Sequence, residues 1–213
     1  MAVSVGVAPR LGAEATVVPV AWLGRDCVAK QRLPKPYRHP RLDDRLRGER
    51  TRDEAALLLA ARRAGVAVPI LYDADRATST LVLERIPGPT LRSVLEADDD
   101  ATAHARLARL GRLAGTLHDA GLTHGDLTTS NVLVPEPGSV DSLVLIDFGL
   151  GAFGEEPEPR GVDLHLVEEA LAATDARHAT LFAALLEGYR ATARCAPAVL
   201  QRLDDIRGRG RYH

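Results

Sequence analysis

Three polar residues in the second half of the chain could carry out phosphoryl transfer. Asp126 lies in the stretch 124–131, which reads HGDLTTSN, and Asn131 follows it by five positions. Asp147 ends an apolar run and begins the tripeptide DFG. A carboxylate at the first position can orient or deprotonate an attacking hydroxyl, while oxygens at the other two can hold magnesium on nucleotide phosphates. The spacing therefore predicts a catalytic base and a pair of metal ligands.

Short apolar runs flank both polar stretches. Residues 132–134 (VLV) leave the first stretch and residues 143–146 (LVLI) enter the second, and such runs predict short strands. Strands at these places would hold Asp126, Asn131 and Asp147 in fixed positions. The order of the motifs is typical of the catalytic loop and the magnesium loop of protein kinases. Two unrelated surface turns are the alternative, but they would not need this order or these flanking strands.

Lys30 is the candidate cation for nucleotide phosphates. It ends the strand-like run 26–30 (DCVAK), and of the 27 basic residues only Lys30 and Lys35 are lysine. In so arginine-rich a chain, a lysine is expected where a compact point charge is needed. A kinase uses such a lysine on its third strand to hold the α- and β-phosphates of ATP. A solvent-exposed lysine at a strand end is the alternative.

Glu54 is the predicted partner of Lys30. The run 43–64 has the pattern of a helix that ends at Gly65, and Glu54 opens its apolar half. In kinases a glutamate at this place pairs with the strand lysine and positions it against ATP. Glu49 competes for this role but lies in the more polar half of the helix, so Glu54 is preferred.

Two backbone segments are expected to supply the remaining ATP contacts. The turn 11–15, with Gly12, would lie over the phosphates, although it has one glycine where the kinase motif has three. An ordinary hairpin turn is the alternative there. The run 85–89 (RIPGP) breaks the strand pattern and predicts a hinge, where backbone groups near Glu84 and Ile86 would read the adenine edge. A plain loop has the same sequence pattern.

The order of elements predicts an α+β, two-lobed protein-kinase-like fold. Residues 1–86 would form a lobe with an antiparallel sheet and one long helix, and residues 87–213 a reduced helical lobe with both polar loops and a basic tail. Only residues 150–161 separate Gly149 from the next helical run, which is shorter than the activation segment of conventional kinases. The expected strands are 3–7, 15–20, 26–30, 70–72 and 80–84, and the expected later helices are 91–96, 101–120, 163–172, 176–193 and 197–207. His118 in the second of these helices is expected to be structural.

Composition sets few limits on function. Hydrophobic residues make up 46% and charged residues 26% of the 213 positions, and the formal net charge of −2 gives no global attraction to nucleic acid. No apolar run approaches the ~20 residues of a membrane span, and the N-terminus does not read as a signal peptide. Cys27 and Cys195 make no metal-ligand spacing, and as plain thiols they indicate a reducing compartment, the cytoplasm.

Two basic stretches could contact a polyanion. Residues 31–52 hold Lys35, Arg38 and further arginines. They predict either an RNA- or phosphate-binding surface or a solvated helix face whose charges pair along the helix. Residues 207–213 (RGRGRYH) predict a mobile basic tail, either a disordered end or a segment that binds RNA or a partner.

Over nearly its whole length the chain resembles the small atypical kinase subunit of the KEOPS complex. RIO kinases and aminoglycoside-type phosphotransferases share the reduced second lobe, but the basic insertion at 34–40 (PKPYRHP) favours the KEOPS family. Pro36, Tyr212 and His213 depart from the family pattern and have no interpretation. The stretches that carry the resemblance are 30–40, 46–55, 124–131, 146–150, 162–164 and the Arg-Gly-Arg end.

The resemblance implies magnesium-dependent use of ATP, as a serine/threonine kinase or an ATPase. It also implies a place beside the subunit that installs threonylcarbamoyl on adenosine in tRNA. The roles carried over are Lys30 for the phosphates, Glu54 as its partner, Asp126 as base, and Asn131 and Asp147 for magnesium; Gly12 is carried over only weakly. A scaffold that binds ATP without turnover is the alternative from another class, and a small-molecule phosphotransferase is a third.

Overall fold

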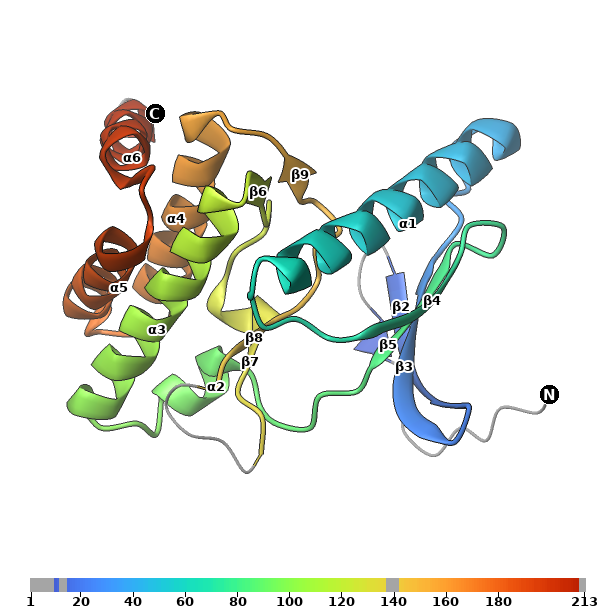
Figure 1. The fold of residues 1–213 in the computed structure, drawn as a ribbon, viewed down its shortest axis with the longest axis horizontal. Helices are drawn as coiled ribbons and strands as arrows, with labels where there is room; N and C mark the ends of the chain where they lie inside the picture. The colour runs from blue at the N-terminus through green and yellow to red at the C-terminus, as the bar shows by residue number, and fades with distance from the viewer. Residues whose placement is uncertain (1–9, 12–14, 137–141, 211–213) are drawn as a thin grey trace. The chain divides into compact units, whose positions relative to one another are not determined.

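The computed structural model describes residues 10–11, 15–136 and 142–210 (Figure 1). The chain divides into two compact units: the first holds residues up to 59 and 69–86, and the second holds residues 60–68 and those from 87 onward. The strand expected at 3–7 and the Gly12 position lie outside the described residues.

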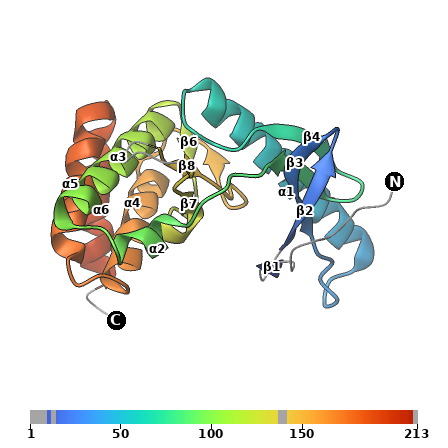
Figure 2. The same cartoon turned by 90° about the horizontal axis from the view of Figure 1, so that it is seen from below.

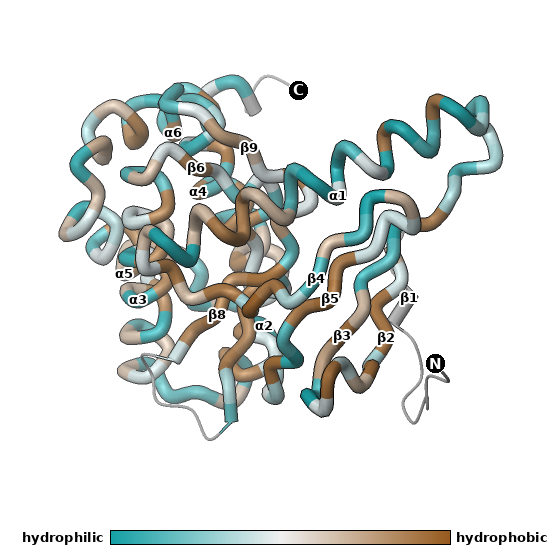
Figure 3. Tube along the Cα trace, turned by 45° about the vertical axis from the view of Figure 1, so that its right-hand side comes forward, coloured by the Kyte–Doolittle hydropathy of each residue, from teal (hydrophilic) through white to brown (hydrophobic). Residues whose placement is uncertain are grey.

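The first unit is built on a five-stranded antiparallel sheet with the order β1-β2-β3-β5-β4. β5 packs on both faces, since Leu81, Val82 and Leu83 are all buried, and it shows as an apolar stretch in Figure 3. The order places β3 between β2 and β5, in the interior of the sheet, where Cys27, Lys30 and Arg32 are buried. The bounds are β1 Arg10–Leu11, β2 Ala15–Trp22, β3 Arg25–Arg32, β4 Leu71–Asp75 and β5 Thr80–Glu84.

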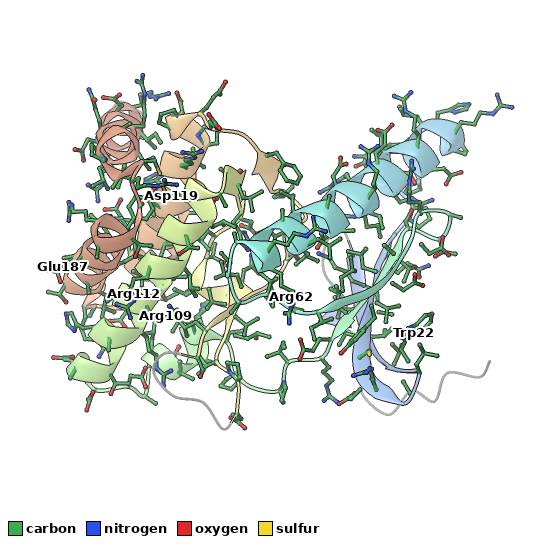
Figure 4. All side chains as sticks on the ribbon, in the orientation of Figure 1. Trp22, Arg62, Arg109, Arg112, Asp119 and Glu187 are labelled. Carbon is green, nitrogen blue, oxygen red and sulfur yellow. The ribbon has the colours of Figure 1, made fainter. Side chains whose placement is uncertain are left out.

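A two-residue hairpin sets the register of β2 and β3. Trp22, labelled in Figure 4, pairs with Arg25 across the hairpin. The two residues between them, Leu23 and Gly24, have φ of 48° and 76°. Two successive positive φ values define a type I′ turn, whose twist matches that of the strands it joins. The turn therefore fixes which face of β3 carries Lys30.

Helix α1 (Pro40–Arg63) follows β3 and begins three residues before the expected start at Asp43. Proline is accepted in the first helical turn because its missing N–H has no helical partner there. The helix ends at Arg63, and Gly65, whose φ is 85°, forms its C-terminal cap as predicted. The N–H of Val66 donates to the carbonyl of Ala61, and that of Gly65 to Arg62. These two bonds form a Schellman motif, which closes the helix end.

The second unit is mainly helical (Figure 2). Two short antiparallel pairs, β6 with β9 and β7 with β8, hold its polar loops. α6 continues through Gly210, so the expectation of a mobile tail from residue 207 is wrong for 207–210; residues 211–213 lie outside the described part. The bounds are α2 Leu91–Leu95, α3 Asp100–Asp119, β6 Leu122–Thr123, a 3-10 turn Thr129–Asn131, β7 Val132–Leu133, β8 Val144–Leu145, β9 Ala152–Phe153, α4 Pro157–Ala172, α5 His178–Thr192 and α6 Ala196–Gly210.

Asp119 joins the end of α3 to the segment that precedes α6. Its carboxylate accepts hydrogen bonds from the backbone N–H groups of Arg194 at 2.9 Å and Cys195 at 3.2 Å. Asp119 is labelled in Figure 4. These bonds satisfy two backbone donors at the turn into α6.

Glycines let α3 and α5 pack with their backbones in contact. A Cβ added at Gly188 would lie 1.9 Å from the carbonyl oxygen of Ala108, and one at Gly111 would lie 2.0 Å from that of Leu185. No real Cβ can approach a backbone oxygen so closely. The two helices can therefore adopt this crossing only with glycine at both positions.

We expect Gly188→Ala to lower the free energy of unfolding by about 2–3 kcal/mol or more, since the methyl group forces α3 and α5 apart. Gly208→Ala is the control, because a Cβ there meets no atom within 4 Å and alanine favours a helix. Urea unfolding of both variants measures the difference. Equal stability of the two variants would contradict the close packing of α3 and α5.

Candidate active site

A buried group of three charged side chains lies in the first unit. Nζ of Lys30 lies 2.7 Å from Oε1 of Glu54, and Nη2 of Arg32 lies 2.5 Å from Oε2. Their side chains are at most 8% exposed. Glu49, the other candidate partner of Lys30, instead faces Arg45 at 3.6 Å and is 41% exposed. The structure therefore contains the expected Lys30–Glu54 pair and adds Arg32, which the sequence interpretation did not include.

Asp126 and Asn131 are held together within the second unit. Nδ2 of Asn131 donates to the backbone oxygen and to Oδ2 of Asp126, both at 2.8 Å. Both amide hydrogens of Asn131 are thus used, and its Oδ1 is the atom left to accept or to bind a cation. Gly125, just before Asp126, has φ of 78°, and a Cβ there would lie 2.0 Å from the carbonyl oxygen of Leu150. Only glycine fits at this turn.

Asp147 follows β8 at a backbone conformation that is uncommon for aspartate. Its φ is 64°, and its Oδ1 accepts a hydrogen bond of 3.1 Å from the N–H of Gly149. Such left-handed conformations of non-glycine residues concentrate at functional sites. The N–H of Ile146 donates to the carbonyl of Asn131 at 3.0 Å, next to the paired strands β7 and β8. The two polar loops are therefore joined through their backbones.

Oxygen donors of this kind fit magnesium. Oδ1 of Asn131 and the carboxylate of Asp147 are hard ligands, and magnesium keeps several waters and needs few protein ligands. Among the described residues no group of three or more His, Cys, Asp or Glu side chains could hold a metal ion. Asn131 and Asp147 stay the candidate ligands that the sequence predicted.

Asp163 on α4 binds the backbone of the loop that carries Asp126, and the sequence interpretation gave it no role. Its carboxylate accepts from the backbone N–H groups of His124 at 2.7 Å and Gly125 at 2.8 Å. Nε2 of His118 lies 3.2 Å from the same carboxylate, and Nδ1 of His118 lies 2.9 Å from the hydroxyl of Tyr189. The three side chains that take part, those of Asp163, His118 and Tyr189, are buried, so His118 is structural, as expected. Burial raises the pKa of Tyr189, which stays a neutral phenol.

His124 is held as one neutral tautomer. Its Nε2 lies 3.0 Å from the carbonyl oxygen of Ile146, which can only accept, so Nε2 carries the hydrogen. Its Nδ1 lies 3.3 Å from the N–H of Asp126 and accepts from it. Burial lowers the pKa of His124, and the negative charge of Asp163 offsets this only in part.

We expect acid to destabilise the protein through His124. The folded state binds fewer protons than the unfolded state below the ordinary histidine pKa of ~6.5, so stability is present above that pH and is lost as the pH falls further. Ring ¹⁵N chemical shifts should show the Nε2–H tautomer at pH 7. Urea unfolding at pH 7.5 and 5.5 should show a smaller pH dependence for His124→Gln than for the wild type. His104→Gln, at a more exposed site on α3, is the control; an unchanged dependence in His124→Gln would contradict the assignment.

The expected adenine contacts can be located only in part. The carboxylate of Glu84 accepts from the N–H of Ile70 at 3.0 Å, and the N–H of Glu84 donates to the Ile70 carbonyl at 2.8 Å. The Glu84 side chain thus joins the start of β4 to β5. Adenine recognition by the backbone of Glu84 and Ile86 stays a prediction.

Several of the basic side chains singled out in the sequence pair with acidic neighbours. Arg47 binds Asp43 at 2.8 Å, and Arg38 lies 3.5 Å from the same carboxylate. In α6, Arg207 binds Glu168 at 2.6 Å and Arg209 binds Glu158 at 2.9 Å. The Arg47–Asp43 pair lies along α1 and matches the alternative of a solvated helix face for residues 31–52, whereas the pairs of Arg207 and Arg209 join α6 to α4.

Two simpler expectations concern the cysteines and membranes. Cys27 is buried, Cys195 is partly buried, and both are free thiols. No helix in the described part of the chain is long and apolar enough to span a bilayer.

Comparison with known proteins identifies a family. The lipopolysaccharide kinase (Kdo/WaaP) family model matches residues 20–153. The EKC/KEOPS complex subunit Tp53rkb of Mus musculus is 42% identical over 206 residues, which cover 94% of this chain and 84% of that protein. A probable bifunctional tRNA threonylcarbamoyladenosine biosynthesis protein of Haloarcula marismortui is 45% identical over 202 residues, and the match covers 94% of this chain but 35% of that protein.

Solved structures of protein kinases have a similar fold. The Rio2 kinase of Chaetomium thermophilum, solved as an ADP/Mg²⁺-phosphoaspartate complex, superposes with a TM-score of 0.67 at 18% identity over 99% of this chain and 72% of that one. This likeness establishes the two-lobed α+β kinase-like fold that the sequence predicted. The chain belongs to the lipopolysaccharide kinase (Kdo/WaaP) family and to the family of the EKC/KEOPS complex subunit Tp53rkb.

Proposed function

We propose that the chain is a magnesium-dependent kinase or ATPase that uses ATP in support of threonylcarbamoyladenosine formation in tRNA, as a subunit of a KEOPS complex. The observation that carries this proposal is the hydrogen-bonded pair Asp126–Asn131, joined through the backbone to the loop of Asp147. The buried Lys30–Glu54 pair supports it independently. Together these residues make up the set that phosphoryl transfer from ATP requires.

Each side chain has a defined task in this proposal. Lys30, held by Glu54, binds the α- and β-phosphates as a point charge. Oδ1 of Asn131 and the carboxylate of Asp147 would hold magnesium, which would supply positive charge to offset that of the phosphate oxygens. Asp126 orients the attacking hydroxyl and accepts its proton at Oδ1, to which no described residue donates a hydrogen bond. The amide of Asn131 fixes the other oxygen of Asp126.

The acceptor is proposed to be water or a serine or threonine hydroxyl that a partner presents. Between Gly149 and the start of α4 at Pro157 the chain has only the two-residue strand β9. A segment this short offers little surface for binding a peptide in extended form. ATP hydrolysis, or phosphorylation of a partner's residue, fits such a site better than phosphorylation of free peptides.

The partner is proposed from the relatives. The chain spans about a third of the bifunctional archaeal proteins that it matches, 35% in the Haloarcula marismortui protein. We propose that the partner is the tRNA threonylcarbamoyl-transferase subunit of the complex, in the cytoplasm. Lys35, Arg38 and the arginines near the C-terminus are the proposed tRNA contacts, although the ion pairs of Arg38, Arg207 and Arg209 would weaken their attraction to phosphates.

Two other functions remain candidates: a RIO-type kinase, which the fold likeness favours, and a scaffold that binds ATP without turnover. A scaffold would need Lys30 and the metal ligands but not a base, whereas Asp126 is present and its position is fixed by Asn131. Calorimetric titration with ATP, with and without magnesium, tests nucleotide use. We expect binding that magnesium strengthens at least tenfold; no binding under either condition would refute the proposal.

A further inference from the structure

Arg32 shares the carboxylate of Glu54 with Lys30. The two cations contact different oxygens of Glu54. Nζ of Lys30 donates to Oε1 at 2.7 Å, and Nη2 of Arg32 donates to Oε2 at 2.5 Å. Lys30 and Arg32 are two positions apart on β3, so both side chains project from the same face of the strand. A lysine–glutamate pair alone would satisfy only one oxygen of this buried carboxylate.

Arg32 also contacts helix α1 at a second place. Nη1 of Arg47 lies 3.4 Å from the backbone oxygen of Arg32. Residues 47 and 54 are seven positions apart, about two helical turns, and therefore lie on the same face of α1. Thr51, between them on this face, is fully buried. The end of β3 is thus attached to α1 at two points along one face, both within the first unit.

The backbone of Arg32 is itself fixed by the sheet. Its N–H donates to the carbonyl of Ser79 at 3.0 Å, and the residue pairs with Ala15 on β2. Its guanidinium is charged at every pH at which the protein is folded. Arg32 therefore presents a permanent cation to Glu54 from a rigid position.

We propose that Arg32 is a positioning residue for ATP use: it holds Oε2 of Glu54 and thereby sets α1 so that Oε1 presents Lys30 to the phosphates. Glu54 then stays partnered when the Lys30 ammonium moves toward a nucleotide, because the Arg32 contact does not change. The glutamate of this site is consequently in place before ATP binds. This inference rests on the proposed function for its effect on ATP, but the Arg32–Glu54 coupling can be measured without nucleotide.

The test is a double-mutant cycle with Arg32→Gln and Glu54→Gln. We expect Arg32→Gln to raise the KM for ATP about tenfold with kcat changed less than about threefold, since the base and the metal ligands are untouched. Arg32→Lys should restore KM to within about threefold, because the contact is made through one nitrogen atom and does not need the planar fork. In the Glu54→Gln background, Arg32→Gln should add little. Arg202→Gln, which breaks an exposed pair with Asp205 on α6, is the control and should change nothing.

The same double-mutant cycle, measured by urea unfolding without nucleotide, tests the Arg32–Glu54 contact separately from the proposed use of ATP. Non-additive effects of the two substitutions on stability support the positioning contact even if the wild type proves not to use ATP, which would refute only the proposed function. Additive effects on stability and on KM would overturn the role of Arg32. So would an unchanged KM in a folded Arg32→Gln variant of a protein whose wild type turns over ATP.

Discussion

Asp126→Asn is expected to lower ATP turnover by about 10²–10⁴-fold, the usual contribution of a positioned base. The asparagine side chain has the same shape and can still accept the hydrogen bond from Asn131 through its oxygen. It cannot take a proton from the acceptor. Because Asp126 acts on the acceptor rather than on the nucleotide, ATP affinity should stay within a few-fold of the wild type.

The measurement is the initial rate of phosphate release at saturating magnesium-ATP, together with the dissociation constant for ATP by calorimetry. Ser130→Ala, at an exposed position in the same loop, is the matched control for disturbance of the loop itself. Full turnover in Asp126→Asn would show that another group activates the acceptor. A large loss of ATP affinity would assign Asp126 to nucleotide binding instead.

Asp147→Asn is expected to abolish the magnesium dependence of ATP binding. Asparagine tolerates the left-handed backbone conformation that Asp147 adopts, whereas alanine at φ of 64° would add strain. The substitution therefore removes the negative charge and leaves the loop folded. Without that charge, magnesium would be held by Asn131 alone among the two candidate ligands, and turnover should fall with metal affinity.

Calorimetric titration with ATP, with and without magnesium, checks this expectation. The wild type should bind ATP more tightly with magnesium, and Asp147→Asn should bind equally with and without it. Asn131→Ala should weaken the magnesium effect in the same direction. If Asp147→Asn kept the full magnesium effect, Asp147 would not be a metal ligand.

The sequence predicted the parts of the site that lie in local motifs. Lys30 could be found because it ends an apolar strand, and Glu54 because it opens the apolar half of a long helix. The pairing of a strand lysine with a helix glutamate in kinases predicted their contact, and the structure places the two charged groups 2.7 Å apart. The spacing of Asp126 and Asn131 placed both in one polar loop, but the hydrogen bond between their side chains was not predicted.

The missed parts depend on tertiary contacts. Asp163 lies within an apolar helical run, and an aspartate between Val162 and Leu164 could have indicated a buried carboxylate with a special partner. Its partners are backbone N–H groups, which leave no trace in the sequence. Arg32 was taken as part of a basic stretch, because a charge pattern does not show which arginine points inward.

The prediction of a mobile tail was wrong for residues 207–210 for a similar reason. Glycine at 208 and 210 argued against a helix, but Arg207 and Arg209 bind Glu168 and Glu158 of α4 and hold α6 through Gly210. Helix propensity differs by only about 1 kcal/mol between glycine and alanine, so such tertiary pairs can override it. The start of α1 at Pro40 was missed because proline was taken as a helix breaker rather than as a first-turn residue.

Phosphate release from ATP by the purified chain, alone and with the tRNA-modifying partner subunit, tests the central claim most directly. We predict turnover that rises when the partner is added and is lost in Asp126→Asn in both states. ATP binding without turnover in either state would contradict an enzyme and would favour a scaffold that uses the nucleotide only to fix its shape.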